Sequence, residues 1–248
     1  MANLVRVLRV ARTGAVRARA KALTQLKSLI VTAPVELRAQ LDGLDGTRLV
    51  TTCARLRPAR DKPPTTPSPF AKRTPRPGRL IDPTAATKRS LASIAGRVQA
   101  LDVEIAELDD DLEALLTPLA PTLLAIQGVG TDVAGQLLVT AGDNPQRITS
   151  EAAFAHLCGV APIPASSGKT QNNHRLNRGG DRNANAALYR IVMCRLRWDP
   201  ATRAYVERRT KQGKSKKHII RCLKRYIARD VYAAIQTDLN PTINTRHP

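Results

Sequence analysis

The stretch KRSLASIAGRVQALDVEIAELDDDLEALLT, residues 88–117, carries the clearest pattern in the chain. Its apolar residues alternate at spacings of three and four: Leu91, Ile94, Val98, Leu101, Ile105, Leu108, Leu112 and Leu115. Such an unbroken series forms one apolar stripe along a helix and is typical of a coiled coil. It predicts a coiled-coil helix over residues 84–120. Its partner is either residues 2–32 of the same chain or the same helix of a second copy.

Residues 2–32 also predict one long helix, because apolar residues recur there at helical spacing and Pro34 ends the pattern. The expected apolar face consists of Leu4, Leu8, Ala11, Ala15, Ala18, Ala22 and Leu29. Arginines and lysines take most of the remaining circumference, which suits either a solvated surface helix or a helix that lies along nucleic acid. The acidic residues between 102 and 113 favour a contact with this basic helix.

A proline-rich segment separates these two helical regions. Eight of the 17 prolines fall within residues 58–83, which excludes a helix or a central strand there. The segment therefore predicts a linker, or a loop at the tip of a helix hairpin, between a first region at 1–57 and the helix at 84–120. The remaining residues, 121–240, predict a compact helical domain. With only 3% aromatic residues and abundant alanine and leucine, the expected fold class is all-α.

Charge indicates the class of partner. The chain has 40 Lys and Arg against 20 Asp and Glu, a net charge of +20, which attracts polyanions. The excess is concentrated between residues 169 and 229, whereas seven acids fall within residues 102–113. The four cysteines are too far apart for a zinc site and predict reduced, mostly buried thiols. No run of apolar residues is long enough for a membrane span. We expect a cytoplasmic, nucleoid-associated protein with no metal site of its own.

The segment LLAIQGVGTDVAGQLL, residues 123–138, predicts a helix-hairpin-helix DNA-binding motif within residues 121–141. Gly128 and Gly130 permit a tight turn, and the free N–H groups that begin at Thr131 can point at a phosphate. Such contacts position a duplex without reading its sequence. A tight turn between two core helices remains the alternative interpretation.

A second segment, residues 159–181, predicts a loop that contains two serines beside a glycine. Ser166 and Ser167 could present a hydroxyl to a phosphodiester, and Lys169, Arg175, Arg178 and Arg182 could stabilise the charge that develops. His174 could act as a base or be a plain surface residue. On spacing alone, a polar Ser/Gly loop is the commoner structure. Helices are expected on both sides, with Ser150 and Asp181 as N-caps and Gly159 just after the first helix.

Basic helices complete the predicted domain over residues 182–236. One helix is expected from Asp199 to Gln212, closed by Gly213, and another begins at Ser215. The apolar face of the last helix should contain Ile219, Ile220, Leu223, Tyr226, Ile227, Val231 and Ala234. Its candidate phosphate-binding residues are Lys216, Lys217, Arg221, Lys224 and Arg225.

Taken together, LLAIQGVGTDVAGQLL, AGDNPQRITSEAAFAHLCGVAPIPASSGKT, HRLNRGGDRNANAALYRIV and GKSKKHIIRCLKRYIARDVYAAI resemble the C-terminal domain of transposases of the insertion-sequence "one-ten" family. Residues 4–57 and 82–122 resemble the coiled-coil middle of that family. The resemblance implies DNA transposition, with DNA cleaved and rejoined through a serine nucleophile. That serine corresponds to Ser167, with Ser166 as the alternative. A non-catalytic DNA- or RNA-binding remnant or scaffold is the alternative function.

The resemblance also implies partners and a cofactor. Family members carry an N-terminal RuvC-like domain whose DEDD acids hold Mg²⁺, are guided by a structured RNA and work as homo-oligomers. This chain begins inside what resembles the first coiled-coil helix. We therefore expect that it lacks the RuvC-like domain, that it binds no cofactor by itself, and that it is a truncated copy unable to transpose alone.

Overall fold

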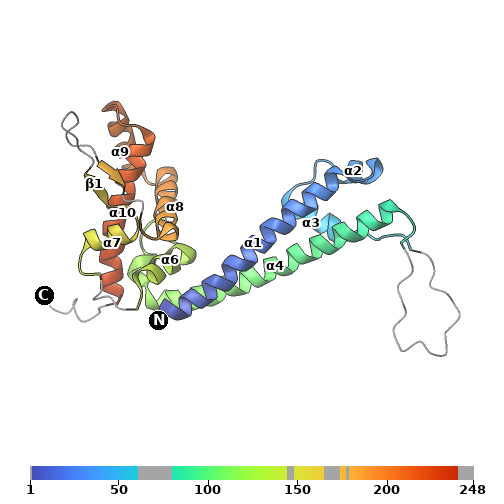
Figure 1. The fold of residues 1–248 in the computed structure, drawn as a ribbon, viewed down its shortest axis with the longest axis horizontal. Coiled ribbons are helices and arrows are strands. Elements are labelled where there is room, and N and C mark those ends of the chain that lie inside the picture. Colours follow the sequence, from blue (N-terminus) through green and yellow to red (C-terminus); the bar gives the residue numbers. More distant parts are fainter. Residues whose placement is uncertain (1, 61–79, 144–147, 165–173, 177–178, 240–248) are drawn as a thin grey trace. The chain divides into compact units, whose positions relative to one another are not determined.

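The computed structural model describes residues 2–60, 80–143, 148–164, 174–176 and 179–239, with the backbone alone described at residues 175 and 176. Most of these residues are helical, as expected (Figure 1). The chain divides into two compact units. One contains residues 12–107, and the other contains residues 1–11 together with residues 108–248. No described helix is long and apolar enough to cross a lipid bilayer.

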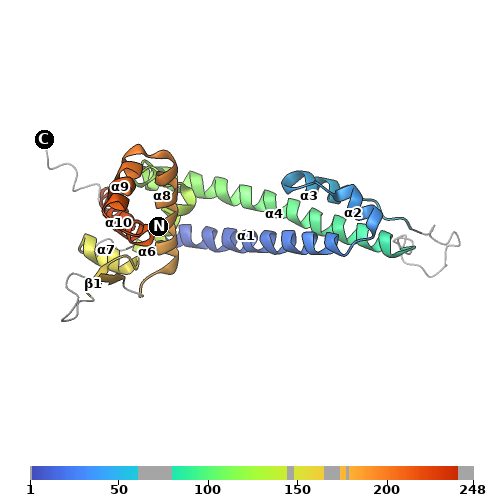
Figure 2. The ribbon, with the colours of Figure 1, turned by 90° about the horizontal axis from the view of Figure 1, so that it is seen from above.

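The unit of residues 12–107 is built on two long helices, α1 (Ala2–Val31) and α4 (Pro83–Leu119), parts of which it contains. They run side by side in both ribbon views (Figures 1 and 2). Ala22 and Leu26 of α1 share a buried core with Leu91 and Val98 of α4. Two short helices, α2 (Val35–Leu41) and α3 (Gly46–Ala54), complete this core. The structure therefore selects the intrachain partner, while the knobs-into-holes packing of a coiled coil stays a prediction.

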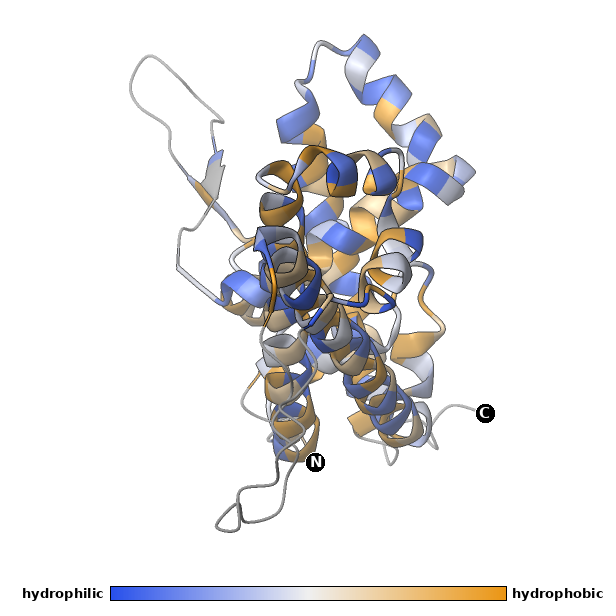
Figure 3. Ribbon diagram, turned by 90° about the vertical axis from the view of Figure 1, so that its right-hand side faces the viewer, coloured by the Kyte–Doolittle hydropathy of each residue, from blue (hydrophilic) through white to orange (hydrophobic). Residues whose placement is uncertain are grey.

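The apolar stripe predicted for α4 faces inward along the whole helix. All eight predicted positions are buried or half-buried, and Leu91, Val98 and Leu112 are completely buried. Figure 3 colours the ribbon by hydropathy and shows hydrophobic and hydrophilic residues mixed along the helices.

The predicted inward face of α1 was right at four positions and wrong at three. Leu8, Ala15, Ala22 and Leu29 are buried or half-buried, whereas Leu4, Ala11 and Ala18 are exposed. The inward positions that recur at spacings of three and four are 5, 8, 12, 15, 19, 22, 26 and 29, and Arg12 and Arg19 occupy two of them. Arg19 forms an ion pair with Asp102 of α4, as the placement of the acidic residues indicated. Because arginines take these two inward positions, the apolar pattern pointed to the neighbouring Ala11 and Ala18 instead.

The second unit is a helical domain centred on α10 (Lys216–Leu239). This helix packs against α5 (Pro121–Leu124), α7 (Glu151–Leu157), α8 (Arg182–Trp198) and α9 (Pro200–Lys211), and α6 (Thr131–Ala141) packs on α8. Phe154, Leu137, Leu188 and Ile227 lie in its core. Val5 of α1 and Leu112 and Leu116 of α4 also belong to this core.

Two short strands interrupt the helical pattern. β1 (Pro162–Pro164) pairs antiparallel with β2 (His174–Leu176), and Ile163 lies opposite Arg175 in the register. The extended loop expected around Pro162 and Pro164 is thus one side of a two-stranded ribbon. Residues 165–173, which join the strands, lie outside the described residues, as do residues 61–79 of the proline-rich segment.

The predicted helix caps were confirmed. The Ser150 hydroxyl accepts a hydrogen bond from the Ala153 amide, and Asp181 accepts one from the Asn183 amide. Asp199, predicted as the first residue of a helix, is instead the N-cap of α9 and accepts hydrogen bonds from the amides of Ala201 and Thr202. Gly159 and Gly213 follow their helices with φ angles of 63° and 74°. All four cysteines are free thiols, of which Cys53 and Cys158 are buried and the other two half-buried.

Candidate nucleic-acid interface and serine-loop stem

The residues that begin and end the serine segment meet at one point. We call residues 157–164, 174–176 and 179–181 the stem. The Asp181 amide donates to the Leu157 carbonyl oxygen over 2.7 Å. Gly180 has a φ of 100°, and a Cβ there would lie 2.7 Å from both the Leu157 carbonyl oxygen and the Gly159 nitrogen. Only glycine permits this approach, so the local sequence fixes how closely the two sides of the stem meet.

Side chains from two helices lock the stem in place. The Asn185 amide donates to the carbonyl oxygens of Cys158 and Gly159 over 3.0 and 2.9 Å. The Asn185 carbonyl oxygen in turn accepts a hydrogen bond from Lys224 Nζ over 2.8 Å. The two carbonyl groups lie beyond the end of α7, so Asn185 satisfies acceptors that the helix itself leaves unpaired.

Asp181 connects the stem to α6 as well as capping α8. Its Oδ2 accepts hydrogen bonds from Thr140 Oγ1 over 2.6 Å and from Gln136 Nε2 over 3.2 Å. Asp181 also contributes, after burial, to raising the pKa of the neighbouring Cys158 thiol to about 12. Cys158 is therefore a protonated, structural thiol rather than a nucleophile at neutral pH.

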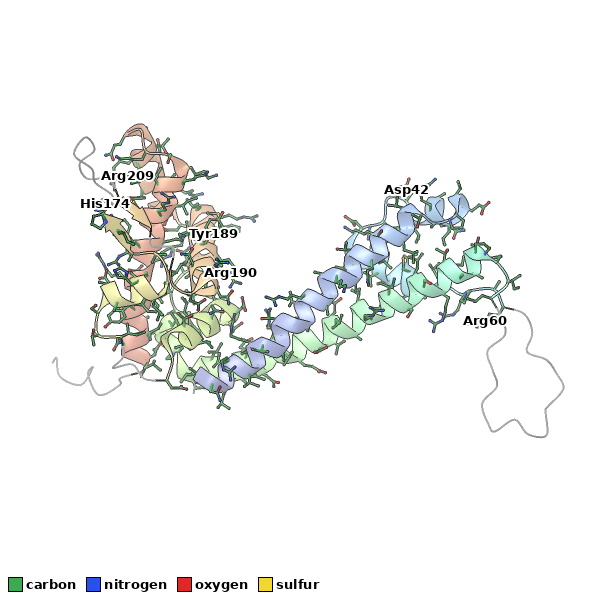
Figure 4. The ribbon with its side chains drawn as sticks, viewed as in Figure 1. Asp42, Arg60, His174, Tyr189, Arg190 and Arg209 are labelled. Carbon is green, nitrogen blue, oxygen red and sulfur yellow. The ribbon has the colours of Figure 1, made fainter. Side chains whose placement is uncertain are left out.

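The basic residues expected on α10 fall into two groups. Lys216, Lys217 and Arg221 are exposed, as is Arg182 at the start of α8. These four are available to phosphate groups. Figure 4 shows the side chains of this unit, where Tyr189 and Arg190 project from α8 and His174 from β2.

The other three α10 cations, Lys224, Arg225 and Arg229, form contacts within the protein. Arg225 and Arg229 both form ion pairs with Glu151, and the Arg225 contact lowers the pKa of that carboxyl. Lys224 is only 8% exposed, and burial followed by the charge of Arg221 lowers its pKa. The expected surface position of Lys224 was therefore wrong: it supports the stem through Asn185 from inside the domain.

The predicted hairpin region contains one turn of helix, α5, a tight turn and α6. Gly128 has a φ of 90°, and a Cβ there would lie 3.2 Å from Cys194 Cβ and 3.3 Å from Ile191 Cγ2. Of the two glycines predicted to permit the tight turn, only Gly128 has a positive φ, since Gly130 has a φ of −100°. Gly128 packs against Cys194 and Ile191 of α8, so its close contact is with another helix of the protein. Gly130 borders open space and precedes Thr131, the first residue of α6.

Asp132 occupies the first turn of α6 and forms ion pairs with Arg9 and Arg190. Burial alone would raise the pKa of the Asp132 carboxyl, but the two guanidinium groups outweigh it and the pKa is lowered. A carboxylate at this helix end also matches the helix dipole. Any phosphate that approaches Gly130 therefore meets one acid and two arginines together.

A pocket of about 280 Å³ lies between the ribbon and α10. Pro162 and His174 line it from the ribbon, and His218, Arg221, Arg225 and Tyr226 line it from α10. Tyr226 was expected on the buried face of α10 but is 49% exposed. Sequence reasoning missed this pocket because Tyr226 lies at the border between the apolar and cationic faces of the helix.

Several predicted site residues lie outside the described residues: Ser166, Ser167, Lys169 and Arg178. Arg175 is in β2, where only the backbone is described. Among the predicted site residues that are described, Arg221 and Arg225 line the pocket, and Arg182 begins α8 directly after the stem. The roles of the two serines stay predictions. Within the described ranges, no group of three or more His, Cys, Asp or Glu side chains could hold a metal ion.

Part of this helical domain is similar to a known protein family. Residues 120–207 match the model of the transposase IS116/IS110/IS902 family. Over these residues, about a third of the chain, the protein is therefore similar to the transposase domain of that family. The match starts at Ala120, before α5, and includes the stem and most of α9.

Two curated relatives match half of the chain. One is the insertion element IS110 uncharacterized 43.6 kDa protein of Streptomyces coelicolor, which is 34% identical over 125 residues. The other is the insertion element IS900 uncharacterized 42 kDa protein of Mycobacterium paratuberculosis, which is 30% identical over 126 residues. The matches cover 31% and 32% of these relatives, so the chain corresponds to about a third of each.

Proposed function

We propose that this chain acts in DNA transposition and that its transposase domain cleaves and rejoins DNA strands through Ser167, with Ser166 as the alternative nucleophile. The match of residues 120–207 to a transposase family carries this proposal. The stem adds support, because its pinned ends and the exposed cations of α8 and α10 belong to the same domain. The proposed substrate is a DNA phosphodiester.

The proposed reaction has two balanced steps. The serine hydroxyl loses its proton, its oxygen bonds to phosphorus, and one sugar oxygen leaves and takes up a proton. The sugar hydroxyl of another strand then attacks the same phosphorus, and the serine oxygen leaves and is protonated again. Lys169, Arg175, Arg178 and Arg182 would stabilise the additional negative charge of each transition state.

The resemblance assigns Mg²⁺ to a separate RuvC-like domain. A guide RNA and a homo-oligomer belong to the same proposal. Leu4, Val7 and Val10 of α1 are each more than half exposed and offer apolar surface that a second copy could cover.

A phosphate contact by the hairpin also belongs to the proposal. We infer that the backbone at Gly130 and Thr131 binds a duplex phosphate, because the first amides of a helix have no partner within the helix, Gly130 provides no side-chain cap, and Gly130 borders open space. Arg9 and Arg190 would reinforce the contact once the phosphate competes with Asp132.

A trap for covalent protein–DNA adducts tests the catalytic part. Supercoiled plasmid and the purified chain are incubated with Mg²⁺, with and without a supplied RuvC-like domain and guide RNA, and protein-linked DNA is recovered after detergent denaturation. We expect an adduct that Ser167→Ala abolishes and that Ser93→Ala, which changes an exposed serine on α4, retains.

The same variants separate catalysis from binding alone. If Ser167→Ala loses the adduct while its DNA affinity stays unchanged, the serine is the nucleophile. If only Ser166→Ala loses it, the assignment moves by one residue. If no condition gives an adduct but DNA binding is intact, the chain is a nucleic-acid-binding remnant, for which its net charge of +20 already provides a basis.

A further inference from the structure

The pocket beside the stem is lined by two kinds of surface. Val160, Pro162 and the ring of Tyr226 supply apolar contacts. Arg221, Arg225 and His218 supply hydrogen-bond donors on the α10 side. A ligand that suits this lining has a flat apolar part and an anionic part next to it.

The Tyr226 ring is positioned by a neighbouring ring and is exposed to a ligand that could stack on it. Its ring lies edge-on to Tyr205 of α9, with ring centroids 5.9 Å apart and planes at 90°. This packing fixes the orientation of the Tyr226 ring, while about half of the residue stays exposed. A fixed, exposed aromatic ring binds a flat partner with little loss of side-chain entropy.

The basic residues of the pocket differ in how far they are able to bind an anionic group. Arg225 already forms an ion pair with Glu151, so part of its charge is neutralised. Arg221 is exposed and forms no ion pair within the described part of the chain, and His218 is exposed one helical turn before it. These two residues are therefore the ones that remain for a phosphate.

The size of the pocket restricts the ligand further. Its volume of about 280 Å³ falls just below the range of ordinary small-molecule sites, which is about 300–1,000 Å³. That volume suits one nucleotide. A base within a duplex is stacked on both faces and cannot reach a ring inside a pocket, so the nucleotide has to be unpaired.

We propose that this pocket binds one unpaired nucleotide of the DNA that the domain acts on, with its base against Tyr226 and its phosphate on Arg221 and His218. The inference rests on the proposed function, because it names the part of the DNA substrate that is held. A nucleotide held there lies next to β1 and β2, the two strands that residues 165–173 connect.

Photo-cross-linking to the wild-type chain gives the first test. A short single-stranded DNA of mixed sequence carries one 5-iodouracil, a base that cross-links to aromatic side chains, and the modified residue is identified by mass spectrometry. We expect the cross-link on Tyr226, and on the Ser167→Ala chain as well, since no chemistry is needed. A cross-link confined to aromatic residues outside the pocket overturns the proposal.

Affinity measurements give the second test, by fluorescence anisotropy at one salt concentration. Tyr226→Leu should weaken single-stranded DNA binding by about 5- to 150-fold, the range for loss of one stacked base. Tyr226→Phe should stay within about twofold, and duplex binding should not change. Tyr189→Leu removes an exposed tyrosine of α8 outside the pocket and is the matched control.

Two further binding measurements test whether the pocket recognises a base and whether it prefers DNA to RNA. An abasic site in place of the stacked base should weaken binding as much as Tyr226→Leu, and equal binding of the abasic strand overturns the role of the base. Tighter binding of the matching RNA strand overturns the assignment to DNA. If the wild-type chain forms no serine adduct but keeps the Tyr226 cross-link, the catalytic proposal fails and the pocket proposal stands.

Discussion

Gly180 is a position where the backbone leaves no room for a side chain. Its φ of 100° disfavours other residues, and a Cβ would press on the backbone of Leu157 and Gly159. We expect Gly180→Ala to lower the free energy of unfolding by more than about 2 kcal/mol, since strain and steric overlap act together. Urea denaturation followed by circular dichroism measures this.

Gly213→Ala is the matched control for that change. Gly213 also has a positive φ, but no atom lies within 4 Å of the place that a Cβ would take. The loss there should be about 1 kcal/mol, from backbone strain alone. Equal losses at the two glycines would show that the approach of Gly180 to α7 contributes nothing to stability.

Lys224 and Lys217 are on the same helix but differ in burial, so they should respond differently to salt. Each phosphate that a lysine neutralises adds roughly 0.9 to the slope of log affinity against log salt concentration. Lys217→Met should reduce the slope of DNA binding by about that amount, because Lys217 is exposed. Lys224→Met should leave the slope unchanged, because Lys224 is buried against Asn185.

Salt titrations of both variants and the wild-type chain check this prediction. A reduced slope for Lys224→Met would mean that Lys224 contacts phosphate after all. Circular dichroism at each salt concentration verifies that the variants are folded, since Lys224→Met also leaves the Asn185 carbonyl oxygen without its donor.

At the level of elements, Glu151 joins the start of α7 to α10 through Arg225 and Arg229. The Arg225 contact lowers the pKa of the Glu151 carboxyl in the folded state, so its stabilising effect is present above the unfolded-state pKa. It disappears as the pH falls through the lowered folded-state value. Glu151→Gln should therefore be less stable than the wild type at neutral pH.

The gap between Glu151→Gln and the wild type should begin to narrow as the pH falls toward the ordinary pKa of a glutamate, about 4.3, and should close once the pH lies below the lowered folded-state pKa. Urea midpoints measured from pH 7 to pH 3 follow this gap. A difference that is constant across the range would assign the effect to packing instead of charge.

The same elements show which features could be predicted from the sequence. The caps at Ser150 and Asp181 were predicted correctly because a side chain there bonds to a backbone amide two or three residues away. The α4 stripe was predicted because it is uninterrupted. Helix caps and an apolar stripe both depend on residues close together in the sequence, so both can be recognised from local spacing.

Features that depend on distant residues could not be predicted. Lys224 is buried because Asn185, on another helix, supplies an acceptor for it. The inward face of α1 includes Arg19 because Asp102 lies opposite on α4. Tyr226 lines a pocket whose other side is the ribbon. Each depends on a contact between segments far apart in the sequence, which no local pattern encodes.

For the whole molecule, the net charge of +20 predicts that the proposed DNA binding weakens steeply as the salt concentration rises. Lys216, Lys217, Arg221 and Arg182 are exposed, and four phosphate contacts correspond to a log–log slope of roughly 3 to 4 in magnitude. Filter binding with duplex DNA at increasing salt concentration measures the slope. A slope near zero would exclude a phosphate interface on this surface.

The hydrogen bond between Leu157 and Asp181 has a consequence for protein engineering and for the divergence of related elements. A segment whose two anchor points touch can be exchanged as a cassette, because a replacement of different length or composition need not change the distance between its ends. Grafting the corresponding segment of the Streptomyces coelicolor relative between these anchors would transfer its chemistry onto an unchanged helical scaffold.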